Sequence, residues 1–319
     1  MPYRLPIAVA AGLVSAVVFA SATTGPLLMR MVLFLLTPLA LFLAGLGLGP
    51  VAAAVAALAG TFLVATVGGA TVALYFAAGS ALPAVILIYL AQLNRREVDG
   101  SVEWYPAGRL VIAAALLAGI FSMLMIFLLG GDVEVLRGNL RSALDQFINL
   151  RLEAVPDAPK LTAQEVDEIA SVALAVFPGF IAGWAMFGLL LNFWLAGRIT
   201  LASGRLQRPW PDLASIFYPP ATPLLLAAAT GASFLAGLPG LIATGFAGPL
   251  FLAYVLLGLA VVHYMSRGRP WGPFALWGLY ASLFILNTIA LPAIALLGLA
   301  EAIWPMRRIS PPPKPPPPT

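Results

Sequence analysis

The sequence predicts an all-α, polytopic integral membrane bundle of about nine or ten transmembrane helices. Charged residues make up only 9% of the chain and hydrophobic residues 61%, whereas a soluble domain has about 25% charged residues to cover its surface. The apolar residues also stand in long runs, which excludes an outer-membrane barrel with its short alternating strands. Helices are then the way in which this backbone satisfies its hydrogen bonds in lipid.

The apolar runs predict where the helices cross the bilayer, because one crossing needs about 20 apolar residues. The expected spans cover residues 5–22, 26–45, 50–67, 71–93, 110–129, 163–198, 221–238 and 241–264. The first run follows Arg4 and ends in Ala20-Ser21-Ala22, so a cleaved signal peptide is the alternative to an uncleaved first helix.

The last apolar stretch, residues 271–304, is too long for one upright span. We interpret it as a hairpin of two short helices, broken between Asn287 and Pro292. The alternative is a single tilted helix. A helix break at membrane depth is tolerated only beside protein or water, so a break here would indicate a cavity.

We expect residues 1–305 to form a single transmembrane domain. Within it, segment 130–168 holds eight of the thirteen acidic residues and is predicted to lie outside the membrane. An amphipathic helix is expected there from apolar residues at helical spacing. Thr162 and Glu165 form a capping box that predicts a new helix from about Ala163. Residues 306–319 are predicted to be a disordered, proline-rich cytoplasmic tail.

Four basic clusters predict the orientation of the chain. They lie at residues 95–109, 198–208, 267–269 and 307–308. Because short cytoplasmic loops are rich in arginine and lysine, all four are expected inside the cell. The sequence therefore predicts a bacterial cytoplasmic (inner) membrane protein with both termini in the cytoplasm.

Several function classes are excluded or disfavoured by what the sequence lacks. The net charge of +4 comes from loop clusters rather than a nucleic-acid-binding face, so we expect no nucleic-acid partner. The chain has no cysteine and one histidine, which argues against a metal site. It has no phosphate-binding loop, zinc-protease motif or nucleophile elbow. We therefore predict no enzyme activity, catalytic residues or cofactor.

Polar residues inside apolar helices are the default candidates for a functional site. Asn192, Tyr280 and Asn287 are predicted to line a substrate cavity near the middle of the membrane. For Asn192 and Asn287, hydrogen bonding between helices is the alternative role.

Ionisable residues near the ends of the apolar runs are predicted to act as interface or ion-pair residues. Arg30 lies close enough to the start of its span to reach lipid headgroups. His263 stands beside Tyr264 at a helix end, where an anchoring role is expected. Glu301 is the only carboxylate in the final apolar stretch and is expected to pair with Arg307 or Arg308.

Two stretches resemble a known family. They are LLLNFWLAGRITLASGRLQRPWPDLASIFYPPATPLL and, near the end of the chain, LLGLAEAIWPMRR. Both are similar to the YybS-like group of bacterial membrane proteins, domain of unknown function 2232. Its matching positions are Asn192, Arg198, Pro223, Gly298, Glu301, Trp304 and Arg307. Glu301 stands where that group typically has aspartate, and Pro305-Met306 departs from the usual approach to the arginine.

That group is distantly reminiscent of the substrate-binding subunits of energy-coupling-factor transporters. The resemblance implies a small-solute-binding bundle that depends on partner proteins for its energy. We therefore expect a transporter-like or solute-binding membrane subunit, in contact with membrane lipids and with partner membrane proteins. The alternatives are a non-transporting scaffold for envelope biogenesis or division and a lipid-modifying membrane enzyme.

Overall fold

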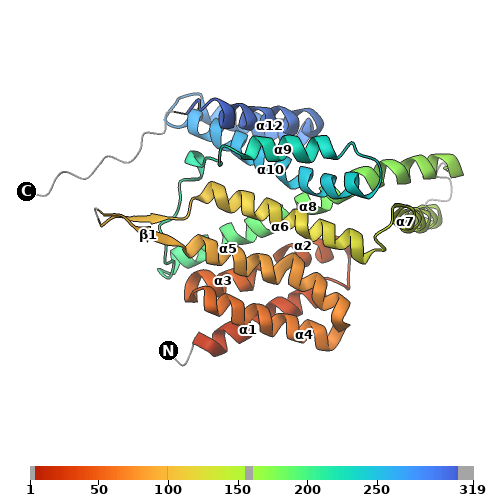
Figure 1. The fold of residues 1–319 in the computed structure, drawn as a ribbon, viewed down its shortest axis with the longest axis horizontal. Helices are drawn as coiled ribbons and strands as arrows, with labels where there is room; N and C mark the ends of the chain where they lie inside the picture. Colours follow the sequence, from red (N-terminus) through yellow and green to blue (C-terminus); the bar gives the residue numbers. More distant parts are fainter. Residues whose placement is uncertain (1–3, 99, 155–160, 308–319) are drawn as a thin grey trace, which may run out of the picture.

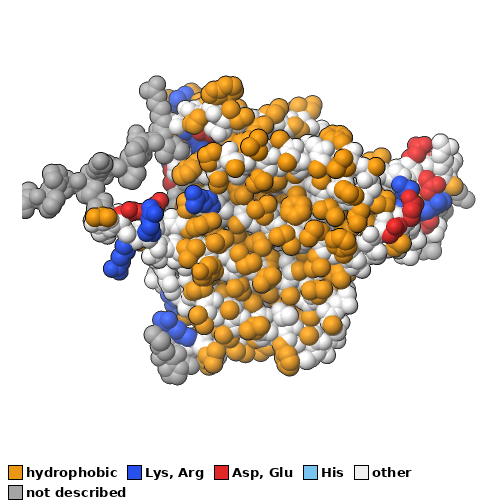
Figure 2. Space-filling view, viewed as in Figure 1, with side chains coloured by type: hydrophobic (Ala, Val, Ile, Leu, Met, Phe, Trp, Pro, Cys, Tyr) orange, Lys and Arg blue, Asp and Glu red, His pale blue; other side chains and the backbone are white. Residues whose placement is uncertain are grey.

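The computed structural model describes residues 4–98, 100–154 and 161–307, with side chains left out for 150–154. Almost every described element is a helix, and most helices run along one direction to form a bundle (Figure 1). On the face seen in Figure 2, apolar side chains predominate between the two ends, and most charged side chains lie at the ends. The prediction of an all-α polytopic membrane protein is confirmed.

The first group of helices comes from residues before the first basic loop. Its elements are α1 (Arg4–Ser21), α2 (Leu27–Leu36), α3 (Leu39–Leu48), α4 (Pro50–Phe76), the π-helical turn η1 (Ala77–Ala81) and α5 (Leu82–Gln92). The predicted span 26–45 is bent between α2 and α3, at Pro38. The wide η1 turn precedes Pro83, whose missing N–H and bulky ring are incompatible with a regular α-helical bond to residue 79.

The α4 helix reverses direction at Gly69, which has a φ of 82° that only glycine adopts readily. Phe76 therefore comes back to contact Gly60. The reversal produces two crossings, residues 50–68 and 70–92, close to the predicted spans 50–67 and 71–93.

The second group begins with a hairpin of two short antiparallel strands and holds the longest helices. Its elements are β1 (Asn94–Arg96), β2 (Val102–Trp104), α6 (Ala107–Leu128), α7 (Val133–Ala154), α8 (Ala163–Ala202), the 3-10 turn η2 (Leu213–Ser215), α9 (Thr222–Ala232), α10 (Leu238–Ser266), α11 (Gly272–Ile285) and α12 (Asn287–Ile303).

Within the described residues, six helical stretches are long and apolar enough to cross a bilayer, and α9, α11 and α12 are shorter apolar helices. The expectation of one full helix over 221–238 is wrong. With 11 residues, α9 rises about 16 Å, roughly half of a bilayer core. Residues 216–219 before it are not helical, and the Tyr218 hydroxyl there donates to the carbonyl of Ala253 in α10.

The last apolar stretch is divided as predicted, but the break lies at Leu286, and α12 continues through Pro292. In Figure 1, α11 and α12 form a hairpin that returns the chain to the end from which α11 started. The structure thus has two short helices here rather than one tilted helix.

The loops that the sequence predicts to be cytoplasmic meet at one end of the bundle, which we call the basic end (Figure 1). It comprises the β1–β2 hairpin, residues 203–215, residues 267–271 and residues 304–307. Two contacts join these segments: Arg267 pairs with Asp212, and Arg307 bonds to the carbonyl of Ala214. A third contact, from Arg208 to the carbonyl of Ala91, ties residues 203–215 to the end of α5. The predicted tail from residue 308 onward lies outside the described residues, and Arg307 itself is part of the bundle.

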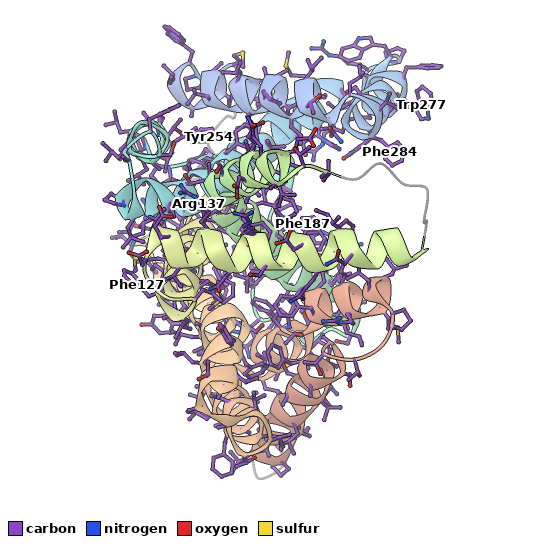
Figure 3. The ribbon with its side chains drawn as sticks, turned by 90° about the vertical axis from the view of Figure 1, so that its right-hand side faces the viewer. Phe127, Arg137, Phe187, Tyr254, Trp277 and Phe284 are labelled. Atoms are coloured by element: carbon purple, nitrogen blue, oxygen red, sulfur yellow. The ribbon has the colours of Figure 1, made fainter. Side chains whose placement is uncertain are left out.

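The opposite end carries the predicted amphipathic helix, α7, which lies across the bundle axis (Figure 3). Leu136 is buried against Ile126, Leu174 and Leu241, whereas Phe147 farther along is 65% exposed. The long α8 projects beyond the membrane-facing surface, and its Asp167 pairs with Arg141 of α7 at 2.7 Å. The capping box starts α8, since the Glu165 carboxylate accepts from the Thr162 N–H at 2.7 Å.

Candidate functional site

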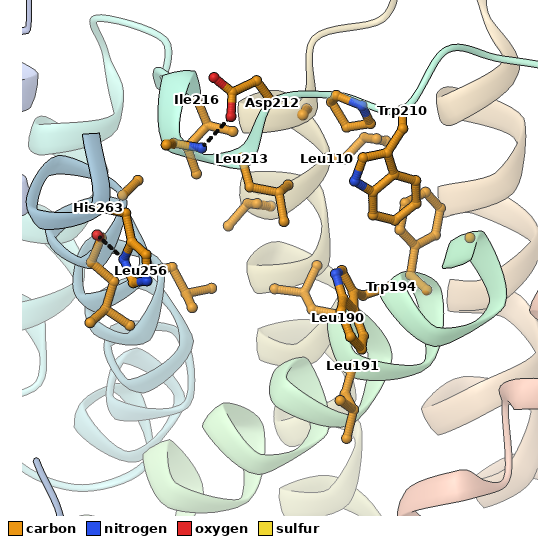
Figure 4. A pocket seen from close by; sticks show the side chains of 18 of the residues that line it. Leu110, Leu190, Leu191, Trp194, Trp210, Asp212, Leu213, Ile216, Leu256 and His263 are labelled. Atoms are coloured by element: carbon orange, nitrogen blue, oxygen red, sulfur yellow. Dashed lines mark hydrogen bonds between the residues drawn. The ribbon is translucent and has the colours of Figure 1, made fainter. Parts of the chain in front are cut away.

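The second group of helices encloses a large cavity next to the basic end. Its volume is about 990 Å³, which is at the upper limit of ordinary ligand pockets. Helices α6, α8, α10 and α11 form its sides, and residues 206–216 close it toward the basic end (Figure 4).

The cavity lies where α8 and α10, which touch near Gly179 and Gly248, move apart toward the basic end of the bundle. A Cβ atom at Gly248 of α10 would collide with the backbone of Gly179 in α8, so the two helices are in backbone contact there. A Cβ at Gly119 of α6 would likewise collide with Phe246. Closer to the basic end the facing side chains are larger, and α8 and α10 stand apart.

The walls of the cavity are mainly apolar. Leucines and aromatic rings predominate, among them Leu110, Leu190, Leu256, Trp194 and Trp210 (Figure 4). Such walls exclude groups that need hydrogen bonds and favour hydrocarbon.

The polar lining residues are concentrated at the basic end of the cavity, where three arginines and one aspartate give a formal excess of two positive charges. Asp212 accepts two hydrogen bonds from the Arg267 guanidinium, at 2.6 and 2.8 Å. These bonds lower the pKa of the Asp212 carboxyl below its ordinary value. Arg269 stacks over Trp271, with 5.2 Å between its central carbon and the ring centre.

Arg208 is the buried cation of the site, with an exposed fraction of 9%. Its guanidinium donates to the carbonyls of Ala91 and Tyr105 at 3.0 and 3.3 Å. No described carboxylate pairs with it, and its Nε has no hydrogen-bond partner among the described residues. Burial lowers the pKa of Arg208, because a charged group is less stable away from water.

His263 joins α10 to α11 across the cavity rim. Its Nδ1 lies 2.8 Å from the carbonyl of Leu259 (Figure 4), and its Nε2 lies 3.1 Å from the hydroxyl of Tyr280. Since a carbonyl only accepts, Nδ1 carries the proton in a neutral ring, and the Tyr280 hydroxyl donates to Nε2. Both residues line the cavity.

A buried ion pair holds the segment that closes the cavity. The Arg307 Nε donates to the Glu301 carboxylate at 2.8 Å, and both side chains are almost completely buried. The other guanidinium nitrogens donate to the carbonyls of Ala214 and Ile216, each at 2.6 Å. The carbonyls at the short η2 turn and just after it thereby obtain the partners that a longer helix would supply.

Of the predicted substrate-binding residues, only Tyr280 lines the cavity. Asn192 is fully buried elsewhere, and its amide donates to the carbonyls of Leu35 and Gly188. It therefore joins α8 to the end of α2, which is the alternative role that the sequence left open. Asn287 is exposed at the start of α12. Neither asparagine lines this cavity, and a substrate-binding role for them stays a prediction.

Of the predicted interface and ion-pair residues, one lines the cavity and the others lie outside its lining. His263 belongs to the cavity, whereas Glu301 and Arg307 support its wall from behind. Arg30 is exposed, and its Nε donates to the carbonyl of Ala22 at 3.3 Å, closing the turn between α1 and α2.

The sequence analysis did not single out Arg208, Trp210 and Asp212 as site residues, although their loop contributed a basic cluster and part of the family resemblance. The available signal was that a tryptophan follows each of two basic clusters predicted to lie at the same membrane face, Trp210 after 198–208 and Trp271 after 267–269. In the described part of the chain, no three His, Asp or Glu side chains gather as a metal site would require.

Comparison with known proteins places this chain in a family. Residues 13–301 match a family model described as a predicted membrane protein, DUF2232. No curated protein and no solved structure is significantly similar to the chain. Because the match covers most of the sequence, the chain belongs to the DUF2232 family of predicted membrane proteins, as the resemblance implied. The family description names neither transport nor an energy-coupling-factor subunit.

Proposed function

We propose that this member of the DUF2232 family is a solute-binding, transporter-like membrane subunit whose solute is an amphiphile. One observation carries the proposal, namely the cavity of about 990 Å³ between α6, α8, α10 and α11. A purely structural scaffold gains stability from filling such a space, because unfilled apolar volume costs packing energy.

The chemistry of the lining supports an amphiphile in particular. Hydrocarbon fits the leucine and tryptophan walls, and a polar group fits the end with Arg208, Arg267 and Arg269. Asp212 and His263 already have hydrogen-bond partners, which supports binding rather than catalysis. The absence of a phosphate-binding loop from the sequence means that any ATP-driven step would need a partner protein.

We further propose that the basic end faces the cytoplasm of a bacterial inner membrane. The support is the arginine content of that end and the acidic content of the α7–α8 end (Figure 2). Since the chain has no cysteine, single cysteines report orientation cleanly. Val98→Cys in the β1–β2 hairpin should resist a membrane-impermeant maleimide in intact cells, and Asp145→Cys in α7 should react. The reverse labelling would refute this orientation.

The cavity is tested by filling it. We expect native mass spectrometry of the wild-type protein, extracted in mild detergent, to detect one retained amphiphile per chain. Leu256→Trp, which adds a ring inside the cavity, should lose that molecule. Ile285→Trp is the matched control, because Ile285 is 73% exposed and lies outside the cavity lining. A wild type without ligand, or equal retention by both variants, would contradict the proposal.

A scaffold for envelope biogenesis is the second candidate function. The α7 helix and the projecting start of α8 favour it, since Phe147 and Val172 are 65% and 66% exposed beyond the cavity-bearing part of the bundle. Mild copurification from the native membrane distinguishes the two functions. Stoichiometric ATPase and coupling subunits support the transporter-like function, and division or envelope-assembly proteins without a retained amphiphile support the scaffold.

A further inference from the structure

We propose that the occupant of the cavity is an anionic phospholipid of the surrounding leaflet, with its phosphate at the basic end and acyl chain along the apolar walls. This inference rests on the proposed function and specifies the ligand class of the same site. It follows from the charge of the lining, from Arg208 and from the way in which the cavity opens.

The charge of the lining selects an anion. Asp212 is already neutralised by its two bonds to Arg267, which leaves Arg208 and Arg269 without a described carboxylate partner. Both line the cavity. A phosphate group accepts several charge-assisted hydrogen bonds from guanidinium groups and would balance these charges.

Arg208 provides an independent reason, because its burial is costly without a counter-ion. The side chain is more than nine-tenths buried, and its Nε has no partner among the described residues. An isolated charge in an apolar environment is strongly disfavoured, and proteins normally supply a paired charge. The described side chains supply no counter-charge, so a ligand phosphate at the basic end of the cavity, which Arg208 lines, would balance this charge.

The opening of the cavity indicates that the ligand enters from the bilayer. Three aromatic lining residues of α8 and α11 remain accessible, with Phe187, Trp194 and Tyr280 exposed by 42%, 42% and 51%. The α11 helix has a single buried residue, Gly272, and its Trp277 and Phe284 point outward (Figure 3). An acyl chain can therefore pass between α8 and α11 without crossing water.

The position of the polar end also matches a phospholipid headgroup. Arg269 and Trp271 stack together at the start of α11, and Arg198 stacks over Trp210 at the end of α8. Tryptophan and arginine are the side chains that concentrate at the headgroup level of a bilayer. A lipid that enters laterally from the bilayer would keep its phosphate at the same membrane depth as the headgroups of the surrounding leaflet.

The test uses the full-length protein, delipidated and then offered defined lipids in native mass spectrometry. We expect dioleoyl phosphatidylglycerol to be retained roughly tenfold better than dioleoyl phosphatidylcholine. Both lipids carry a phosphate, but the choline cation of the second cancels its charge, and the excess positive charge of the lining favours the lipid with a net negative charge. Inorganic phosphate should not displace it, because the apolar walls hold the acyl chain. Leu256→Trp should abolish retention of both lipids.

The arginine variants locate the headgroup. Arg269→Gln and Arg208→Gln should each lower phosphatidylglycerol retention about tenfold, and Arg205→Gln should leave it unchanged. Arg205 is the matched control because it is an exposed arginine of the same loop region outside the lining. Arg269→Gln is informative even if Arg208→Gln fails to fold, since Arg269 is exposed and its guanidinium, unlike that of Arg208, holds no described backbone carbonyl.

The two proposals fail in different ways. Equal retention of both lipids that is lost in Leu256→Trp would overturn the anionic ligand and keep the cavity as a binding site. Retention that survives Leu256→Trp would overturn both. An equal loss in Arg205→Gln and Arg269→Gln would also overturn the headgroup site, because general surface charge would then explain the preference. Displacement by inorganic phosphate would indicate a soluble anion instead of a lipid.

Discussion

The two groups of helices differ in how they fill the membrane. In the first, α1, α3, α4 and α5 meet through glycine and alanine, and a Cβ at Gly12 would collide with the backbone of Ala56. In the second, α8 and α10 touch closely at Gly179 and Gly248 but then enclose a large cavity.

Charge follows the same division. Residues 1–93 hold two charged side chains, Arg4 and Arg30, whereas the second group buries Arg208, Glu301 and Arg307. Burying a charged side chain costs free energy, whereas a helix contact made of glycine and alanine has no such cost. The cavity of the proposed function therefore lies in the group that buries charge, whereas the first group is held together by close backbone packing.

The largest expected effect comes from breaking the support of the cavity wall. Arg307→Met leaves the Glu301 carboxylate buried without its partner and frees the carbonyls of Ala214 and Ile216. We expect a loss of about 3–5 kcal/mol in the free energy of unfolding. Intrinsic tryptophan fluorescence during heating in detergent measures it.

The control for this variant is an exposed ion pair. Glu103→Gln removes a carboxylate that pairs with Arg95 in the β1–β2 hairpin, where the side chains are 58% and 74% exposed, and should change stability by less than about 1 kcal/mol. The double variant Glu301→Gln, Arg307→Met should be less destabilised than the sum of the single variants. Additive losses would show that the pair is not the source of the effect.

The next effect contrasts the packing of the two groups. Gly12→Ala adds a methyl group where the Ala56 backbone already lies, so we expect a destabilisation of about 1–3 kcal/mol. Gly278→Ala in α11 has open space around the new methyl and should be neutral or slightly stabilising. Thermal unfolding of both variants provides the comparison. Equal stability of the two would refute the close packing of α1 on α4.

A smaller effect concerns the attachment of α11 to the cavity rim. Tyr280→Phe removes the hydrogen bond to His263 and should cost about 0.5–1.5 kcal/mol locally. Amide hydrogen exchange should become faster across residues 272–285 and stay unchanged in α4. Tyr89→Phe is the control, because Tyr89 is an exposed tyrosine of the first group. Unaltered exchange in α11 would mean that this bond does not hold the helix in place.

The smallest expected effect depends on pH. The Asp212 carboxyl has a lowered pKa in the folded protein because Arg267 bonds to it. Its contribution to stability is therefore present above the ordinary aspartate pKa and is lost as the pH falls below about 4 through the lowered value. Since both side chains are more than one-third exposed, solvent screening keeps this contribution below about 1 kcal/mol.

Thermal unfolding at pH 6 and pH 3 measures the change. Asp212→Asn should remove that part of the pH dependence, and Asp145→Asn in α7 should leave it in place. A pH dependence identical in wild type and Asp212→Asn would exclude a role for the pair in stability.

The sequence by itself determined the membrane class, the all-α fold and most helix positions. A hydrophobic run determines a helix without distant contacts, because in lipid each helix makes all its backbone hydrogen bonds within itself. The capping box at Thr162 and Glu165 was also readable for this reason, since its partners are three residues apart. The turn at Gly68-Gly69 and the basic clusters that gather at one end of the bundle were equally local signals.

The tertiary structure alone decided where the cavity lies. The contact of Arg208 with Ala91 and that of Arg307 with Ala214 join residues 117 and 93 positions apart. The helix faces that line the cavity depend on how α8 and α10 cross at Gly179 and Gly248. No residue pattern within a single helix specifies that crossing. For the same reason Asn192, a polar residue of an apolar helix, serves a helix contact, and the cavity between four helices is closed at one end by residues of the loop that follows α8.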